Sequence, residues 1–196
     1  ADRTAAGNKE PSLAEMTTKA IQMLSKNRKG YVLMVEAGRI DHAHHGGNAR
    51  RALQDTVALN AALKAAMDSV DLRDTLIVVT SDHSHAFTMA GYPERGNPIL
   101  GVVAAPVGTP TLAKDGKAYT TLGYANGPGA VTATERPDPA KEDTGALNYR
   151  QQSLVGLSSE THGGDDVVAR AAGPKAHLFK GTIEQIPLPD DSVDVI

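Results

Sequence analysis

The chain has 196 residues, a formal net charge of −3 and no cysteine. This length is enough for one domain, whose core would be built mainly from Ala, Val, Leu and Ile because aromatic residues make up only 4% of the chain. The negative charge argues against nucleic acid or an anionic membrane as a partner, the lack of cysteine excludes disulfides, and no apolar run reaches the about 20 residues that span a bilayer.

The first predicted elements are a helix and a buried strand. Ser12, with Glu15 three residues later, has the spacing of a capping box, and the apolar residues that follow recur at helical spacing until about Leu24. Residues 31–35 form a continuous apolar run, which is typical of a strand covered on both faces in a parallel sheet. Glu36 follows at the carboxyl end of this predicted strand.

The next elements complete a predicted βαβ unit. Asn48 can cap a helix that continues to about Val70 with one apolar stripe. Residues 75–80 form the clearest strand pattern of the chain, and Asp82 follows it directly. Strand, helix and strand with short connections predict a right-handed parallel unit, and such sheets bind ligands beyond the carboxyl ends of their strands.

The second half of the chain is more polar. Residues 99–104 predict a further strand, whereas residues 106–152 are rich in Gly, Pro and Thr, have a weak strand pattern around 119–122, and are interpreted as an insertion or surface subdomain. Apolar segments at 154–157 and 167–172 flank a third histidine-containing loop. The elements together predict an α/β fold with a mainly parallel sheet flanked by helices and a polar, loop-rich insertion.

Six of the seven histidines lie in three short clusters that also contain carboxylates, at residues 36–45, 82–85 and 161–166. Imidazole and carboxylate ligands without thiolate are typical of catalytic zinc, or of zinc together with magnesium. Because two clusters follow neighbouring strands, the pattern predicts two metal ions about 4 Å apart, an arrangement suited to phosphoryl transfer. Phosphate esters are the natural substrates of such a site.

The first cluster offers several candidate ligands. Asp41 and His45, four residues apart, share a face if a helical turn forms there, and Glu36 can face the same ion or a neighbouring one. His42 and His44 compete with His45 for the ligand position, and spacing alone does not choose between them. The alternative is a solvated polar loop in which Asp41 caps a helix.

The other two clusters each allow two interpretations. Asp82 and His83 can both turn toward a metal where the strand ends; otherwise Asp82 caps a following helix and His83 is merely buried. His85 is interpreted as orienting a metal-bound carboxylate from behind, or as a plain surface histidine. His162 precedes two glycines that permit close backbone approach, and a helix beginning at Asp165 would direct its positive end toward the site. A lone loop histidine is otherwise structural.

Four segments in order resemble the alkaline phosphatase family. They are Val-Glu-Ala-Gly-Arg-Ile-Asp-His-Ala-His-His, Val-Val-Thr-Ser-Asp-His-Ser-His, Gly-Tyr-Ala-Asn-Gly-Pro-Gly and Ser-Ser-Glu-Thr-His-Gly-Gly-Asp-Asp-Val. The similarity is closer to the animal-like branch than to the enterobacterial one. It implies that residues 1–185 are the carboxyl-terminal part of a catalytic domain that hydrolyses phosphate monoesters with two zinc ions and one magnesium ion.

The resemblance also implies the role of each candidate residue. The implied metal ligands are Asp41, His45 and His162 on the first zinc, Asp82 and His83 on the second, and Glu36 on magnesium. His85 would lie behind the first zinc, hydrogen-bonded to Asp41. His42 would occupy a position that varies within the family and tunes metal choice and phosphate contact.

The chain also departs from the family. Family members are considerably longer, and the resemblance implies that an amino-terminal half, which this chain lacks, carries the nucleophilic serine, a phosphate-binding arginine and an aspartate shared by the second zinc and magnesium. No catalytic residue is therefore assigned here, and the sheet is expected to be incomplete. Residues 186–196 form an atypical tail that weakly resembles a segment of nucleotide-fold methyltransferases, consistent with a truncated or chimeric reading frame.

Three hypotheses on function follow. In the first, a complementary chain or upstream segment completes a phosphomonoesterase that is a homodimer and is exported to the periplasm or outside the cell, as the resemblance implies. In the second, the chain alone is a metal-binding fragment without turnover. In the third, the complete protein is a related phosphodiesterase, sulfatase or mutase, which the upstream nucleophile would identify.

Overall fold

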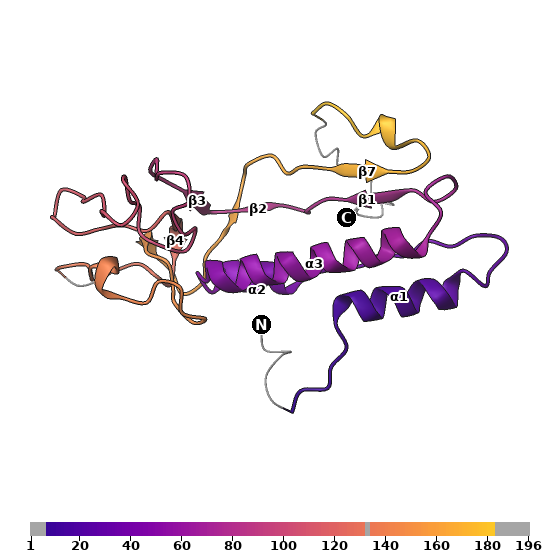
Figure 1. Ribbon diagram of the computed structural model, residues 1–196, viewed down its shortest axis with the longest axis horizontal. Coiled ribbons are helices and arrows are strands. Elements are labelled where there is room, and N and C mark those ends of the chain that lie inside the picture. Colours follow the sequence, from indigo (N-terminus) through magenta and orange to yellow (C-terminus); the bar gives the residue numbers. More distant parts are fainter. Residues whose placement is uncertain (1–6, 132–133, 183–196) are drawn as a thin grey trace.

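The computed structural model describes residues 7–131 and 134–182 (Figure 1). The α-helices are α1 (Leu13–Leu24), α2 (Arg39–His45) and α3 (Ala49–Ser69), and the 3-10 helices are η2 (Pro139–Lys141) and η3 (Ala176–Leu178). The strands are β1 (Ile77–Val79), β2 (Ser84–His85), β3 (Phe87–Met89), β4 (Leu122–Gly127), β5 (Ser153–Gly156), β6 (His162–Gly163) and β7 (Arg170–Ala172). The predicted tail at 186–196 lies outside the described residues.

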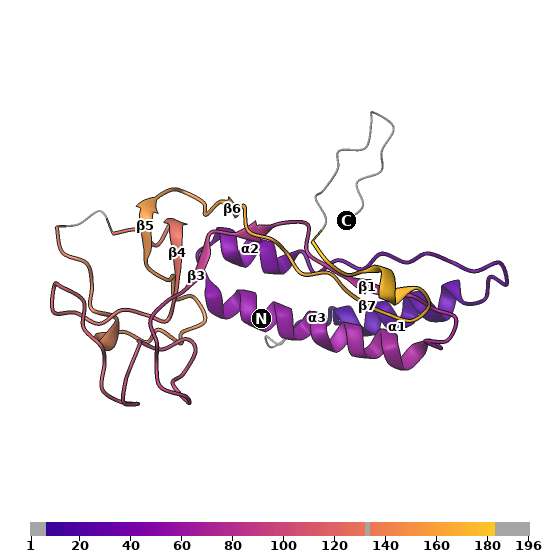
Figure 2. The same ribbon diagram turned by 90° about the horizontal axis from the view of Figure 1, so that it is seen from above.

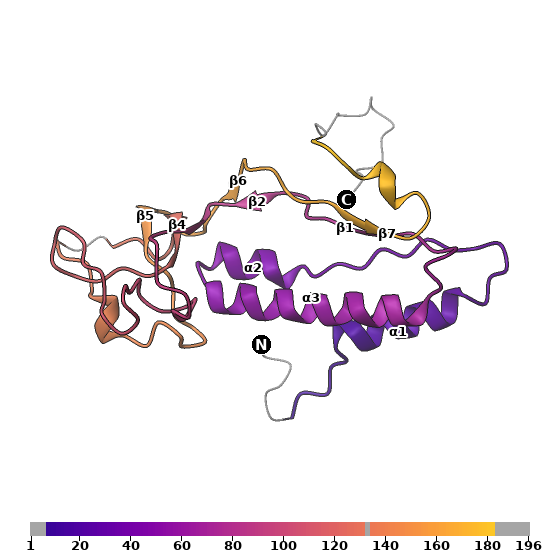
Figure 3. The same cartoon turned by 45° about the horizontal axis from the view of Figure 1, so that its top comes forward.

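The molecule is elongated. Figure 2 shows β3, β4, β5 and their loops at one end and helix α1 with the β1–β7 pair at the other. The β2–β6 pair connects the two ends and runs above α2 (Figure 3). No helix among residues 7–131 and 134–182 is long and apolar enough to cross a membrane.

Helix α1 begins as the sequence predicts. The Ser12 backbone N–H donates to Glu15 Oε2 at 2.7 Å, and the Glu15 backbone N–H donates to Ser12 Oγ at 3.2 Å, so the capping box is confirmed. Thr17 and Ile21 are buried, at 3% and 5% exposure, where α1 packs on α3. Local side-chain chemistry sets the start of this helix, and packing on α3 supports it.

Helix α3 also begins and ends close to its predicted bounds. Asn48 Oδ1 accepts a hydrogen bond from the Arg51 backbone N–H at 3.0 Å, which is the predicted cap. A second cap comes from far along the chain, because Gln151 Oε1 accepts a hydrogen bond from the Ala49 backbone N–H at 2.8 Å. Asn48 Nδ2 donates in turn to Leu147 O. The start of α3 is therefore joined to the loop region that precedes β5.

The predicted mainly parallel sheet is not what the described residues form. They contain three small sheets, in which β1 pairs with β7, β2 with β6 and β3 with β4, all antiparallel, and only β4 and β5 are parallel. The α/β class holds, since helices and strands are both present. The sequence pattern identifies strand segments but carries no information about which distant segment pairs with each.

The prediction of a buried strand at 31–35 is also wrong, because the sequence pattern does not show whether a segment has pairing partners. These residues have no regular secondary structure, and Val32 and Met34 are 95% and 67% exposed. A strand buried on both faces needs neighbours on either side, and residues 31–35 have no ladder partner in the described part of the chain. The βαβ unit consequently lacks its first paired strand here.

The remaining strand predictions are partly confirmed. Residues 99–104 contribute only isolated bridges, Val102 with Thr120 and Ala104 with Pro110. The weak pattern at 119–122 ends at the first residue of β4, the run at 154–157 overlaps β5, and the end of 167–172 forms β7. The predicted helix at Asp165 is absent, because residues 164–169 have no helical turn.

The predicted insertion at 106–152 has ordered contacts of its own. Val103, Ala118 and Leu122, the last at the start of β4, are at most 2% exposed and belong to the apolar core. Arg136 joins the loops around it, because its Nε lies 2.7 Å from Asp115 Oδ2 and its Nη1 donates to Ala118 O at 2.6 Å. The loops of this region therefore pack against one another and against the three-stranded sheet.

Candidate metal centre

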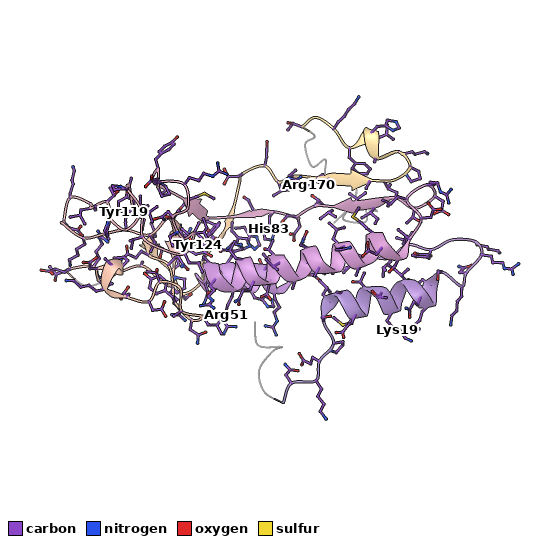
Figure 4. The ribbon with its side chains drawn as sticks, in the orientation of Figure 1. Lys19, Arg51, His83, Tyr119, Tyr124 and Arg170 are labelled. Atoms are coloured by element: carbon purple, nitrogen blue, oxygen red, sulfur yellow. The ribbon has the colours of Figure 1, made fainter. Side chains whose placement is uncertain are left out.

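The candidate site lies where α2, β2 and β6 meet (Figure 3). Helix α2 forms at the predicted place and carries Asp41 and His45 four residues apart, on one face. Strands β2 and β6 pair so that His85 lies opposite His162. His83 precedes β2, and in Figure 4 it lies between the ribbon of β2 and the helices below. Three segments that are far apart in the sequence thus bring histidines and an aspartate together.

Four imidazole nitrogens surround one carboxylate oxygen. Asp41 Oδ1 lies 3.2 Å from Nε2 of both His45 and His85, 3.5 Å from Nε2 of His162 and 3.9 Å from Nε2 of His83. The oxygen is buried and accepts no hydrogen bond from the described residues. Because a buried oxygen without a partner costs free energy, this arrangement fits a cation bound at Asp41 Oδ1.

Three of these donor atoms have the spacing that zinc requires. His45 Nε2, His162 Nε2 and Asp41 Oδ1 form a triangle with edges of 3.2, 3.2 and 3.5 Å. Zinc binds imidazole and carboxylate at about 2.0–2.2 Å in tetrahedral geometry, which separates neighbouring ligand atoms by about 3.3–3.6 Å. The side chains present therefore fit a zinc ion, with the fourth position of the tetrahedron left for another ligand.

Hydrogen bonds to main-chain carbonyls set the ring orientation of two histidines. His45 Nδ1 lies 2.6 Å from Glu160 O, and His83 Nδ1 lies 3.0 Å from Ser84 O. A carbonyl oxygen only accepts, so Nδ1 of each ring must carry the hydrogen. Nε2 of His45 and of His83 is then free to bind a metal ion, the arrangement usual for histidine ligands.

Glu160 is the functional candidate that the sequence did not single out. The residue as a whole is 1% exposed, and its Oε2 lies 2.8 Å from His85 Nδ1. Its Oε1 accepts a hydrogen bond from the Ala86 backbone N–H at 2.6 Å. The available signal was its place two residues before His162 in a loop already marked as a site. Sequence alone gives no indication that this carboxylate is buried.

His44 supports the site from the side of β3 and β4. Its ring stacks on that of His85 with centroids 4.6 Å apart, and its Nδ1 is hydrogen-bonded with the Tyr124 hydroxyl at 2.9 Å. Burial, aided by the nearby His85, lowers the pKa of His44 to about 4, so this ring is neutral at physiological pH. Burial also raises the pKa of Tyr124 above its ordinary value. Of the histidines in α2, His45 is therefore the one whose ring nitrogen faces Asp41 Oδ1.

Comparison with known proteins identifies the family. The sequence matches the alkaline phosphatase family profile over residues 2–191. The chain belongs to the alkaline phosphatase family. It is 48% identical over 181 residues to the tissue-nonspecific isozyme of alkaline phosphatase from Gallus gallus and to that from Homo sapiens, and 47% identical to that from Rattus norvegicus. The predicted resemblance, including its animal-like character, is confirmed.

Each of these alkaline phosphatases is much longer than this chain. The aligned residues cover 92% of the chain but only 34% of each relative. Alkaline phosphatases use zinc and magnesium ions, and the described residues contain two groups of donors close enough to hold a metal ion. These groups are Asp41 with His83 and His162, and His45 with His85 and Glu160.

Three of the residues singled out from the sequence lie outside both groups of this alkaline phosphatase chain. Glu36, His42 and Asp82 are exposed. Asp82 is nevertheless close to the centre, because its Oδ2 lies 3.4 Å from His83 Nε2. The residues predicted for the first zinc thus come together within this chain, whereas Glu36 and Asp82 belong to neither group of donors.

Proposed function

We propose that this chain forms the carboxyl-terminal part of a metal-dependent enzyme that hydrolyses phosphate monoesters. The observation that carries the proposal is the triangle of Asp41, His45 and His162, whose edges fit tetrahedral zinc. Membership in the alkaline phosphatase family supports the reaction class. When bound, two zinc ions and one magnesium ion would supply electrostatic stabilisation of the charge that develops on the phosphoryl group.

In this proposal the chain's own residues bind and orient the ions. The proposed ligands are Asp41, His45 and His162 for the first zinc, Asp82 and His83 for the second, and Glu36 for magnesium. His85 is not a ligand in this proposal; its Nε2 lies 3.2 Å from Asp41 Oδ1, behind the proposed ligand carboxylate. His42, exposed beside Asp41, is proposed to affect metal choice and contact with the phosphate.

The nucleophile is proposed to come from an amino-terminal half of the complete protein. The two serines near the centre are already engaged, because Ser81 Oγ donates to His83 O at 2.7 Å and Ser84 Oγ accepts from the Asp165 backbone N–H at 3.0 Å. Neither is therefore assigned as nucleophile. Without a nucleophile and a phosphate-binding arginine, this chain alone is expected to be inactive.

The proposal extends to the assembly and its location. The apolar run at 31–35, with Val32 95% exposed and Met34 67% exposed, is a surface that further residues of the complete protein would cover. We infer from family membership that the complete enzyme is a homodimer and is exported to the periplasm or outside the cell.

The test is reconstitution with a complementary amino-terminal segment from a relative. The mixture, supplied with zinc and magnesium at alkaline pH, should release phosphate from an aryl phosphate, whereas the chain alone should not. The matched control is the same mixture with Asp41→Asn, which keeps the shape of the side chain and removes its charge. An aryl sulfate and a bis-aryl phosphate in the same assay test the sulfatase and phosphodiesterase alternatives. A mixture that binds zinc and remains inactive on the aryl phosphate would contradict the proposal.

A second function is favoured by one observation. All three corners of the zinc triangle come from this chain, so metal binding does not require another segment. The chain alone would then be a metal-binding protein without turnover. Two results together would support this function over phosphate monoester hydrolysis: the isolated chain binds zinc at a fixed stoichiometry, and the reconstituted mixture is inactive.

A further inference from the structure

Glu160 joins the segments that carry the candidate ligands. Its backbone N–H donates to His45 O at 3.0 Å, and its own carbonyl oxygen accepts from His45 Nδ1 at 2.6 Å. Its carboxylate contacts His85 Nδ1 and the Ala86 backbone N–H. One residue therefore contacts both the end of α2 and strand β2, while standing two positions before His162 in β6.

The surroundings leave Glu160 little freedom to move. Its side chain is 0% exposed, and a Cβ atom added at Gly127 would lie 3.1 Å from Glu160 Cβ. Gly127 has a φ of +134°, a conformation that residues with a side chain rarely adopt. Glycine at position 127 thus lets β4 pass close to Glu160, and a larger residue there would crowd it.

Both carboxylate oxygens of Glu160 are already in use. Oε1 accepts from Ala86 N–H at 2.6 Å and Oε2 accepts from His85 at 2.8 Å. His45, the third member of this group, uses its Nδ1 for the Glu160 carbonyl. The group of His45, His85 and Glu160 is therefore better suited to support a neighbouring metal ion than to bind one of its own.

We propose that Glu160 is the positioning residue of the metal centre, with its carboxylate holding the His85 ring and its carbonyl holding the His45 ring so that Nε2 of each faces Asp41 Oδ1. Both Nε2 atoms lie 3.2 Å from that oxygen. Buried hydrogen-bond partners of this kind orient metal ligands, and their loss typically lowers metal affinity by about 10–100-fold. The inference rests on the proposed metal site and not on the proposed hydrolytic reaction.

A carboxylate is required at this position, because two donors converge on it. Glutamine has the same shape but offers one acceptor and one donor group. If its oxygen faces Ala86 N–H, its NH₂ group faces His85 Nδ1 and displaces the hydrogen there; if it is turned round, its NH₂ group meets the Ala86 N–H. The variant Glu160→Gln therefore either moves the hydrogen of His85 from Nδ1 to Nε2 or loses the contact with Ala86 N–H, while the carbonyl contact to His45 remains.

The experiment uses the full chain with ¹⁵N-labelled histidine. In the metal-free wild type, Nδ1 of both His45 and His85 should carry a hydrogen, which nitrogen chemical shifts report. In Glu160→Gln the shifts of His85 should change and those of His45 should not, and zinc affinity, measured by competition with a chromogenic chelator, should fall about 10–100-fold. The matched control is Glu94→Gln, because Glu94 also accepts a backbone N–H, that of Val107 at 2.8 Å, in the loop region around 90–107.

Two results would overturn the proposal. One is a wild-type His85 whose Nδ1 carries no hydrogen, and the other is a folded Glu160→Gln variant that binds zinc as tightly as the wild type. If the variant does not fold, the nitrogen chemical shifts of His45 and His85 in the wild type are sufficient to test the proposal. An inactive reconstituted enzyme whose His85 shifts and zinc affinity respond as expected would refute the proposed hydrolysis and leave the role of Glu160 supported.

Discussion

Removal of zinc should lower the melting temperature of this chain. Without a cation, His45 Nε2 and His162 Nε2 lie 3.2 Å apart, and their lone pairs repel unless His162 adopts the tautomer that carries its hydrogen on Nε2. Asp41 Oδ1 is at the same time buried without a hydrogen bond among the described residues. A zinc ion removes both penalties and joins α2 to β6, which are far apart in the sequence.

The size of the effect follows from mass action. At free zinc 100-fold above its dissociation constant, the folded state gains about 2.7 kcal/mol if the unfolded chain binds no zinc. For a domain of this length each kcal/mol shifts the melting temperature by about 2–4 °C, so the expected shift is about 5–11 °C. The shift should grow with the logarithm of the zinc concentration.

The assay is thermal unfolding followed by circular dichroism, with zinc, with a chelator, and with zinc restored. Asp41→Asn is the control, because it keeps the volume of the side chain and removes the charge that holds the cation. Its melting temperature should not respond to zinc. An unchanged wild-type melting curve after chelation would refute the reasoning, since the folded state would then gain no stability from a bound zinc ion.

Three further predictions concern residues around the site and the fold. A Cβ atom at Gly163 would lie 2.6 Å from His85 O, so Gly163→Ala should separate β6 from β2 and weaken zinc binding by about tenfold or more in a chelator competition. The control Gly164→Ala should bind zinc as the wild type does, because a Cβ atom at Gly164 would have no atom within 4 Å. Equal zinc affinities of the two variants would show that the spacing of β2 and β6 is not critical. Asn48→Ala removes the cap of α3 and should cost about 1–2 kcal/mol in urea unfolding, and a change within error would mean that other contacts alone maintain that end of α3. Burial raises the pKa of Tyr149 to about 12, so the folded state keeps a proton that the unfolded state loses above about pH 10, and stability should fall between pH 10 and 12. Tyr149→Phe should make that fall less steep, and identical pH profiles would contradict the assignment.

The helices could be predicted because their signals are local. The capping box of Ser12 and Glu15 and the cap at Asn48 each depend on atoms within a few residues, and the structure confirms both. The sheet could not be predicted in the same way. Ile77 pairs with Ala172, and nothing in the period of either segment indicates that partner.

In the candidate site, too, residues marked by local sequence could be predicted, and residues placed by long-range contacts could not. Asp41, His45 and His162 stand out from the sequence because histidines and carboxylates are dense around them, and the structure brings them within 3.5 Å of one another. That they bind metal stays a prediction. Glu160 could not be singled out, since its place at the centre comes from burial beneath Gly127 and from donors on two other segments. A glutamate in a polar loop looks the same in sequence whether it is exposed or enclosed.

The double cap of α3 has a consequence for exchanging parts between relatives. The first turn of this helix depends on Gln151, whose side-chain oxygen accepts from Ala49 N–H and whose backbone N–H donates to Gly47 O. A chimera that replaces the surface loops but stops short of residue 151 keeps this junction. One that also replaces Gln151 would loosen the first turn of α3, on which α2 with Asp41 and His45 packs. A loss of metal binding in that chimera would reflect the lost cap rather than altered ligands.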